Sequence, residues 1–317
     1  MTMTMTRIFL QVALSLILLI PFKGLSKASP TNSKPRDNII GGPLPLPFPV
    51  SDFTKTVASV QNTYCGVGYN DPDTKIDDQT ILYSLGDGST EPRVNIYHSD
   101  SLGLIVAYMG TNLTSTPSVG RLAELYLVPA DPALGLPSDA QVIKGWQDGW
   151  SISWNDVKSS LYKAKDTYPD LKLVVTGHSQ GSADGELAAL SILKEFGSDF
   201  ISKIITYGPP RVGNQAYADA FDSHFKGRHT AVTNGNDWVQ SLPPPIGFRH
   251  VSGMTWIYPP NSTSWGFYPD QEDLNGVDTH PPELIDNGQI FWGDHQGIYM
   301  HSSMGIHSPC PAKVGGF

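Results

Sequence analysis

A serine lies at the centre of residues 177–181, GHSQG, between two segments of different periodicity. The apolar run before it, 172–176, has the composition of a buried strand, and residues 182–197 carry apolar side chains at helical spacing. A strand that turns into a helix within five residues strains its central residue and crowds the positions two before and two after it, where glycine fits. The pattern predicts that Ser179 is an exposed nucleophile beside a helix N-terminus, where an oxyanion can be stabilised.

A serine hydroxyl needs a base, and that base needs an acid to orient it. In the arrangement that goes with this turn, the acid and then the histidine follow the serine along the chain. We predict that Asp237 is the acid, because it comes just after an expected strand and before a proline-rich loop. Asp222 falls within an expected helix, where we expect a solvated charge, and Asp273 and Asp278 lie in an irregular polar stretch.

Seven histidines follow Ser179, and most are expected to be structural or surface groups. We predict that His295 is the base, because it lies late in the chain among aromatic residues that can pack its ring. His250 is the alternative. His178 is next to the nucleophile, and we expect it to point away from Ser179 and to serve in packing.

Strands and helices alternate along the segments that carry these residues. A hairpin is expected over 93–110, strands over 171–177, 201–208 and 229–234, and helices over 153–169, 182–197 and 213–225. This alternation predicts the α/β class, with a mostly parallel sheet, helices on both faces, and sites beyond the carboxyl ends of the strands.

The N-terminal part of the chain reads as a targeting segment followed by an irregular arm. Residues 1–28 carry one early positive charge, Arg7, then an apolar run, and end on a small-x-small pattern, as in a secretory signal peptide. The alternative is a membrane anchor, but the apolar run is shorter than the roughly 20 residues that a bilayer needs. Residues 29–50 are rich in proline and glycine and are interpreted as an arm or pro-segment, and we expect one domain over 51–317.

Composition limits the partners. Removal of residues 1–28 takes away three positive charges and no acid, so the net charge moves from −9 to −12. Without a lysine or arginine cluster, nucleic acids and anionic membranes are not expected as partners. Two sequons, at Asn112 and Asn261, fit a secreted glycoprotein. The two cysteines, Cys65 and Cys310, can form at most one bond with each other, and without a Cys/His cluster they predict a staple and no metal site.

Several ordered motifs over residues 55–312 resemble the fungal class 3 lipase family, which also includes type A feruloyl esterases. The motifs are LIVAYMGTN, VIKGWQDGW, VVTGHSQG, ITYGPPRVGNQAYADAF, NDWVQSLPP and DHQGIYM. The resemblance implies an α/β-hydrolase fold and a triad of Ser179, Asp237 and His295. It also implies an oxyanion hole formed by the backbone N–H groups of Thr111 and Gln180, with about 3 kcal/mol from each donor, and leaves open the Thr111 hydroxyl as a further donor. It further implies a disulfide between Cys65 and Cys310 and no metal or organic cofactor.

The chain departs from the family pattern at four positions. Methionine replaces the usual arginine at 109, lysine the usual histidine at 144, glutamine the usual leucine at 180, and serine the usual second glycine at 182. None of these changes removes a reacting group. Tyr299 also follows His295 by four residues, where three is commoner in the family.

The expected lid, residues 112–123, follows the oxyanion residue and has only three sizeable apolar side chains, Leu113, Val119 and Leu122. We therefore expect a secreted, monomeric serine carboxylester hydrolase of lipase type that acts on acyl esters, with transient contact at a lipid–water interface. The first alternative is a feruloyl-type esterase for aromatic or short soluble esters. The second is an inactive relative that binds esters or carbohydrate.

Overall fold

The computed structural model describes residues 44–273, 276, 285–286, 289–290 and 292–315. The expected signal peptide, residues 1–28, and most of the arm, 29–50, lie outside the described residues. Within the described part, no helix has both the length and the apolar character needed to cross a bilayer.

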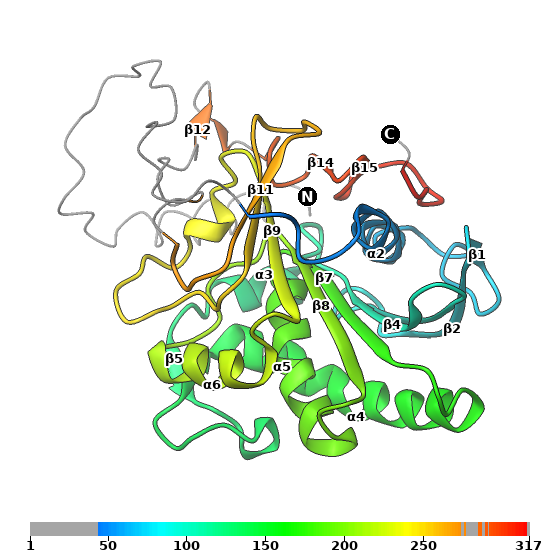
Figure 1. The fold of residues 1–317 in the computed structure, drawn as a ribbon, viewed down its shortest axis with the longest axis horizontal. Coiled ribbons are helices and arrows are strands. Elements are labelled where there is room, and N and C mark those ends of the chain that lie inside the picture. The colour runs from blue at the N-terminus through cyan, green and yellow to red at the C-terminus, as the bar shows by residue number, and fades with distance from the viewer. Residues whose placement is uncertain (1–43, 274–275, 277–284, 287–288, 291, 316–317) are drawn as a thin grey trace.

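A nine-stranded sheet forms the centre of the molecule (Figure 1), in the spatial order β1-β2-β3-β4-β7-β8-β9-β10-β11. The strands are β1 (Lys75–Ile76), β2 (Gln79–Leu85), β3 (Val94–Ser99), β4 (Gly103–Tyr108), β7 (Leu173–His178), β8 (Ile201–Tyr207), β9 (His229–Asn234), β10 (Met254–Ile257) and β11 (Trp265–Tyr268). The central strands from β4 to β10 pair in parallel, and the outer pairs are antiparallel. The α/β class is confirmed.

Helices cover both faces of this sheet. They are α2 (Val50–Thr63), α3 (Thr116–Leu122), α4 (Lys144–Thr167), α5 (Gln180–Phe196) and α6 (Gln215–Phe225). Figure 1 shows α4, α5 and α6 together on one side and α2 on the other. Short antiparallel pairs are formed by β5 (Leu127–Pro129) with β6 (Gln141–Ile143), β12 (Ile285–Asp286) with β13 (Gln289–Ile290), and β14 (Ile298–Tyr299) with β15 (Ser302–Ser303).

Side-chain alternation along the central strands feeds two hydrophobic cores. In β4, Leu104 and Val106 pack toward α4 and α5, while Ile105 and Ala107 pack toward α2. Both faces of the central strands are therefore covered, which explains why β7 is buried at every position.

Two helices differ from expectation. Helix α4 begins at Lys144, nine residues before the expected start, because Trp146, Trp150 and Trp154 continue its buried face at four-residue spacing. Helix α2 was not expected at all. Phe53, Val57 and Val60 form its buried face against the sheet.

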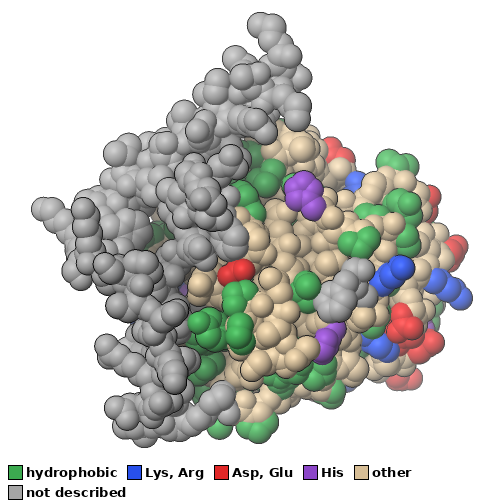
Figure 2. Space-filling view, turned by 90° about the horizontal axis from the view of Figure 1, so that it is seen from above, with side chains coloured by type: hydrophobic (Ala, Val, Ile, Leu, Met, Phe, Trp, Pro, Cys, Tyr) green, Lys and Arg blue, Asp and Glu red, His purple; other side chains and the backbone are tan. Residues whose placement is uncertain are grey.

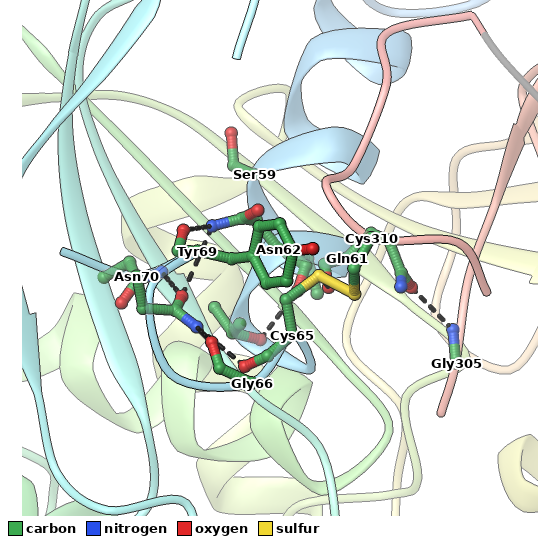
Figure 3. The surroundings of a disulfide bond; sticks show 12 residues. Ser59, Gln61, Asn62, Cys65, Gly66, Tyr69, Asn70, Gly305 and Cys310 are labelled. Carbon is green, nitrogen blue, oxygen red and sulfur yellow. Dashed lines mark hydrogen bonds between the residues drawn. A yellow bond between two sulfur atoms is a disulfide. The ribbon is translucent and has the colours of Figure 1, made fainter. Parts of the chain in front are cut away.

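A disulfide joins Cys65, just beyond α2, to Cys310 near the end of the chain, with the two Cα atoms 5.7 Å apart (Figure 3). Beside it, the side chain of Gln61 accepts a hydrogen bond from the peptide N–H of Gly305, at 2.9 Å. The pairing implied by the family resemblance is therefore present. It attaches the segment that follows His295 to the helix on the opposite face from α5.

Candidate active site

Ser179 stands at the turn from β7 to α5, with φ 57° and ψ −129°. Glycine is required on both sides of it. A Cβ added at Gly177 would lie 2.1 Å from the carbonyl oxygen of Gly181, and one added at Gly181 would lie 2.5 Å from that of Met109. Ser182 ties the turn to the sheet, because its hydroxyl lies 2.9 Å from the carbonyl oxygens of Gly177 and of Tyr207. The strained turn expected from the sequence is therefore present.

The acid and the histidine predicted from sequence lie together. His295 Nδ1 donates to Asp237 Oδ2 at 2.8 Å, and both side chains are buried. The other carboxylate oxygen of Asp237 accepts from the peptide N–H of Val239, at 2.9 Å. With its proton on Nδ1, a neutral His295 keeps Nε2 free to accept a proton. Glycine is again required, since a Cβ at Gly208 would lie 2.8 Å from Asp237 Oδ2.

His178 stacks on the ring of His295 and makes a hydrogen bond to its backbone. The two rings stack with centroids 4.6 Å apart, and His178 Nε2 donates to the carbonyl oxygen of His295 at 2.9 Å. The Tyr64 hydroxyl donates to His178 Nδ1 at 2.6 Å and accepts from the N–H of Gly110. Burial, with a smaller effect of His295, holds the pKa of His178 well below its usual value, so the ring stays neutral. The expected packing residue thus also fixes the backbone of His295 by hydrogen bonding.

Two peptide N–H groups in the lining of this site are candidate oxyanion donors. The N–H groups of Thr111 and Gln180 have no hydrogen-bond acceptor among the described residues. The Thr111 hydroxyl donates to the side-chain oxygen of Gln180, at 3.1 Å. Both residues line the same cavity as Ser179. Unpaired donors of this kind can bind an anionic oxygen.

Ser179 and His295 line the same cavity, which has an empty volume of about 770 Å³, part of it open to solvent. No hydrogen bond joins the Ser179 hydroxyl to the described residues, and such contacts often form only when substrate is bound. The lining is mainly apolar, with Leu113, Val119, Leu122, Leu125, Val239 and Leu242. Trp238 and Trp292 flank His295, with their ring centroids 5.0 Å apart.

All three apolar side chains of the expected lid face this cavity, and α3 lies within that segment. Polar contacts hold its outer side to the turn between β2 and β3. The Asn112 amide donates to the carbonyl oxygen of Gly88 at 2.9 Å, and the hydroxyls of Ser115 and Ser89 are 2.8 Å apart. Arg121 donates to the carbonyl oxygens of Ser89 and Thr90.

The other candidate residues lie elsewhere. His250 is buried and donates through Nε2 to the carbonyl oxygen of Gln240 at 2.7 Å, and it does not line the cavity. Asp222 was expected to be a solvated charge. That expectation is wrong, because its carboxylate accepts from the N–H and hydroxyl of Ser252 and so ties α6 to the segment before β10. Asp273 does not line the cavity, and Asp278 lies outside the described residues.

Comparison with known proteins decides the family. Residues 105–246 match the family Lipase (class 3). The chain is 50% identical to the secreted mono- and diacylglycerol lipase 3 of Gibberella zeae, over 98% of this chain and 96% of that protein. The chain belongs to the class 3 lipase family. This class 3 lipase is also 38% identical to the secreted mono- and diacylglycerol lipase MDL4 of Malassezia globosa, over 86% of this chain and 89% of the relative.

Solved structures agree on the fold. One is a triacylglycerol lipase whose catalytic centre is formed by a serine protease triad, with TM-score 0.62 and 25% identity over 81% of this chain and 95% of that one. Another is a fungal lipase–inhibitor complex, with TM-score 0.65 and 24% identity over 78% and 93%. The α/β-hydrolase fold is confirmed, and this class 3 lipase is a secreted carboxylic ester hydrolase, like its relatives.

Proposed function

We propose that this lipase hydrolyses mono- and diacylglycerols through an acyl-enzyme on Ser179. The observation that carries the proposal is the buried 2.8 Å contact between Asp237 and His295, at a cavity that Ser179 also lines. In the proposed first step, His295 Nε2 takes the hydroxyl proton as Ser179 Oγ attacks the ester carbonyl. Asp237 stabilises the imidazolium that forms, and the N–H groups of Thr111 and Gln180 receive the oxyanion.

Collapse of the tetrahedral intermediate breaks the bond to the glycerol oxygen, which leaves with the proton that His295 returns to it. Water then attacks the acyl-enzyme in the same way, with His295 as base, and releases the fatty acid and the free Ser179 hydroxyl. Every proton in this cycle passes through His295. No metal or organic cofactor takes part in the proposed steps.

The acylglycerol assignment is supported by the names of the relatives and by the lining of the cavity. Leu113, Val119 and Leu122 offer an apolar surface for an acyl chain. On the His295 side, Trp238 and Trp292 occupy space that the alcohol part of the ester would need. That crowding favours an alcohol part that carries no or one further acyl group, as in mono- and diacylglycerols, over one that carries two, as in a triacylglycerol.

We also propose an oligomeric state and a place of action for this lipase. The lipase would act as a monomer, with residues 51–317 as one domain, and would meet its substrate at a lipid–water interface. On the face shown in Figure 2, most of the visible charged side chains gather at the edge near β1.

Of the two sequons, we propose that Asn261 carries the glycan, because it is exposed and its amide nitrogen donates to no described residue.

The test compares wild type with Ser179→Ala on emulsified mono-, di- and trioleoylglycerol and on methyl ferulate. We expect hydrolysis of the mono- and diesters, and a loss of at least about 10⁴-fold in Ser179→Ala with an unchanged melting temperature. Near-wild-type hydrolysis by the variant would overturn the triad. Preference for methyl ferulate would instead assign the aromatic-ester alternative, and equal rates on all three glycerides would overturn the proposed discrimination.

A further inference from the structure

The side chain of Gln180 lies between two hollows behind the nucleophile. It is only 3% exposed and lines both the main cavity and a smaller void of about 200 Å³. That void is bounded by Met109, Arg121 and Asp184, among others. At this buried position, the hydrogen-bond partner of the Gln180 side chain sets the orientation of its amide.

That partner is the Thr111 hydroxyl, which donates to Gln180 Oε1 at 3.1 Å. A hydroxyl has one proton to donate. While the proton is given to Gln180, it is not available to an oxyanion in the main cavity. The Thr111 side chain is therefore engaged in a brace and cannot at the same time act as a third oxyanion donor.

The brace acts at a sensitive point of the backbone. Thr111 directly precedes the lid segment, in which the N–H of Asn112 donates to the hydroxyl of Ser118 at 2.9 Å. A displacement of α3 would therefore pull on the peptide of Thr111. Oxyanion donors work only when they lie about 2.7–3.1 Å from the developing charge. A tether from Thr111 to the first residue of α5 keeps this donor fixed relative to Ser179.

We propose that Gln180 is a positioning residue that holds the Thr111 peptide N–H in the oxyanion hole through the Thr111 hydroxyl. The inference rests on the proposed function, since it assumes the oxyanion hole. Leucine, the residue that the family resemblance leads one to expect at this position, has no acceptor for the hydroxyl. The device is therefore a property of this chain's own sequence.

The experiment is a double-mutant cycle with Gln180→Met, which keeps the size of the side chain but removes its acceptor, and Thr111→Val, which removes the hydroxyl. The measured quantities are kcat and KM on a soluble ester, p-nitrophenyl butyrate. Each single change should lower kcat about fivefold, the effect of one hydrogen bond, with KM unchanged. The double variant should lose no more than either single variant, and Thr111→Ser, which keeps the hydroxyl, should recover most of the kcat that Thr111→Val loses.

Three outcomes would overturn the inference: additive losses in the double variant, no loss in either single variant, or an increase in Gln180→Met beside a loss of about 100-fold in Thr111→Val. The last pattern would make the hydroxyl a third oxyanion donor. If Gln180→Met is not recovered folded, Gln180→Leu takes its place in the cycle. Ser179→Ala is assayed in parallel, so that an active Ser179→Ala rejects the proposed function and an additive cycle rejects only the brace.

Discussion

Two buried carboxylate–imidazole contacts lie at opposite ends of strand β9. His229 begins the strand, and its Nε2 lies 3.6 Å from Glu186 Oε1. Asp237 follows the strand at its carboxyl end and accepts from His295 at 2.8 Å. Both pairs are almost completely shielded from solvent. An acid beside a histidine, buried in a hydrolase, is therefore no sign of catalysis by itself.

The surroundings separate the two pairs. His229 Nδ1 donates to the carbonyl oxygen of Ser252, and Glu186 accepts from the Tyr217 hydroxyl at 3.0 Å, so both side chains are engaged in joining α5, α6 and the sheet. Within the described part of the chain, Nδ1 is the only ring nitrogen of His295 with a hydrogen bond, and the ring lines a cavity. The pair with reactive potential lies at the carboxyl end of the parallel strands, where sites of this fold class are found.

The substitution Asp237→Asn should have the largest effect on the pair that lines the cavity. An amide cannot hold the imidazole proton on Nδ1, nor stabilise the imidazolium that forms during attack, so kcat should fall about 10⁴-fold. Wild-type and variant rates on a soluble ester give the effect, and the melting temperature serves as the control for folding. A loss below about tenfold would show that His295 does not depend on Asp237.

A third buried histidine, His250, lies beside a carboxylate, that of Glu272, and makes stability depend on pH. Burial, followed by the charge of Arg211, lowers the pKa of His250 to about 4. Burial is the largest single effect on Glu272 and acts to raise its pKa, but the hydrogen bonds and charge of Arg211, together with the neighbouring His250, outweigh it and lower that pKa to about 2. His250 is therefore neutral in the folded state at a pH where the unfolded chain already binds a proton, because histidine usually titrates near 6.5.

The direction of the pH effect on stability follows from the difference between the pKa of His250 in the folded and in the unfolded state. The contribution of His250 to stability is complete above about pH 6.5 and decreases as the pH falls. At pH 4 the loss of stability amounts to roughly 3 kcal/mol. We expect wild type to lose that much more than His250→Gln between pH 7 and pH 4 in the free energy of unfolding by urea. Parallel losses in the two proteins would contradict the assignment.

Sequence alone predicted the turn around Ser179 better than the rest of the candidate site. Ser179 lies in a turn whose requirements are local, with Gly177 and Gly181 within two residues, so the motif contained the geometry. Asp237 and His295 required long-range order, and position along the chain together with the family motifs selected them. In contrast, the sequence carries no capping signal for α2, because Pro49 at its N-cap makes no side-chain hydrogen bond, although Phe53, Val57 and Val60 have helical spacing.

The contacts that hold the candidate site residues in place could not be predicted from the sequence, for a physical reason. His178 takes its role from Tyr64, which is 114 residues away, and from the carbonyl oxygen of His295, 117 residues away. No spacing rule links such positions. The brace from Thr111 to Gln180 is similar, since it depends on a side-chain rotamer at the junction of two elements. Local motifs predict which groups react, whereas the groups that hold them are set by packing.

The smallest expected effect is that of Glu186→Gln, which makes at the other end of β9 the same chemical change as Asp237→Asn. The amide keeps the shape of the carboxylate but weakens its contacts with His229 and the Tyr217 hydroxyl, so the free energy of unfolding should fall by about 1–3 kcal/mol. The values of kcat and KM should stay within about twofold of wild type, because Glu186, His229 and Tyr217 do not line the cavity. A large loss of kcat in a protein of unchanged stability would mean that the Glu186–His229 pair is coupled to the site through α5, and that the two ends of β9 do not act independently.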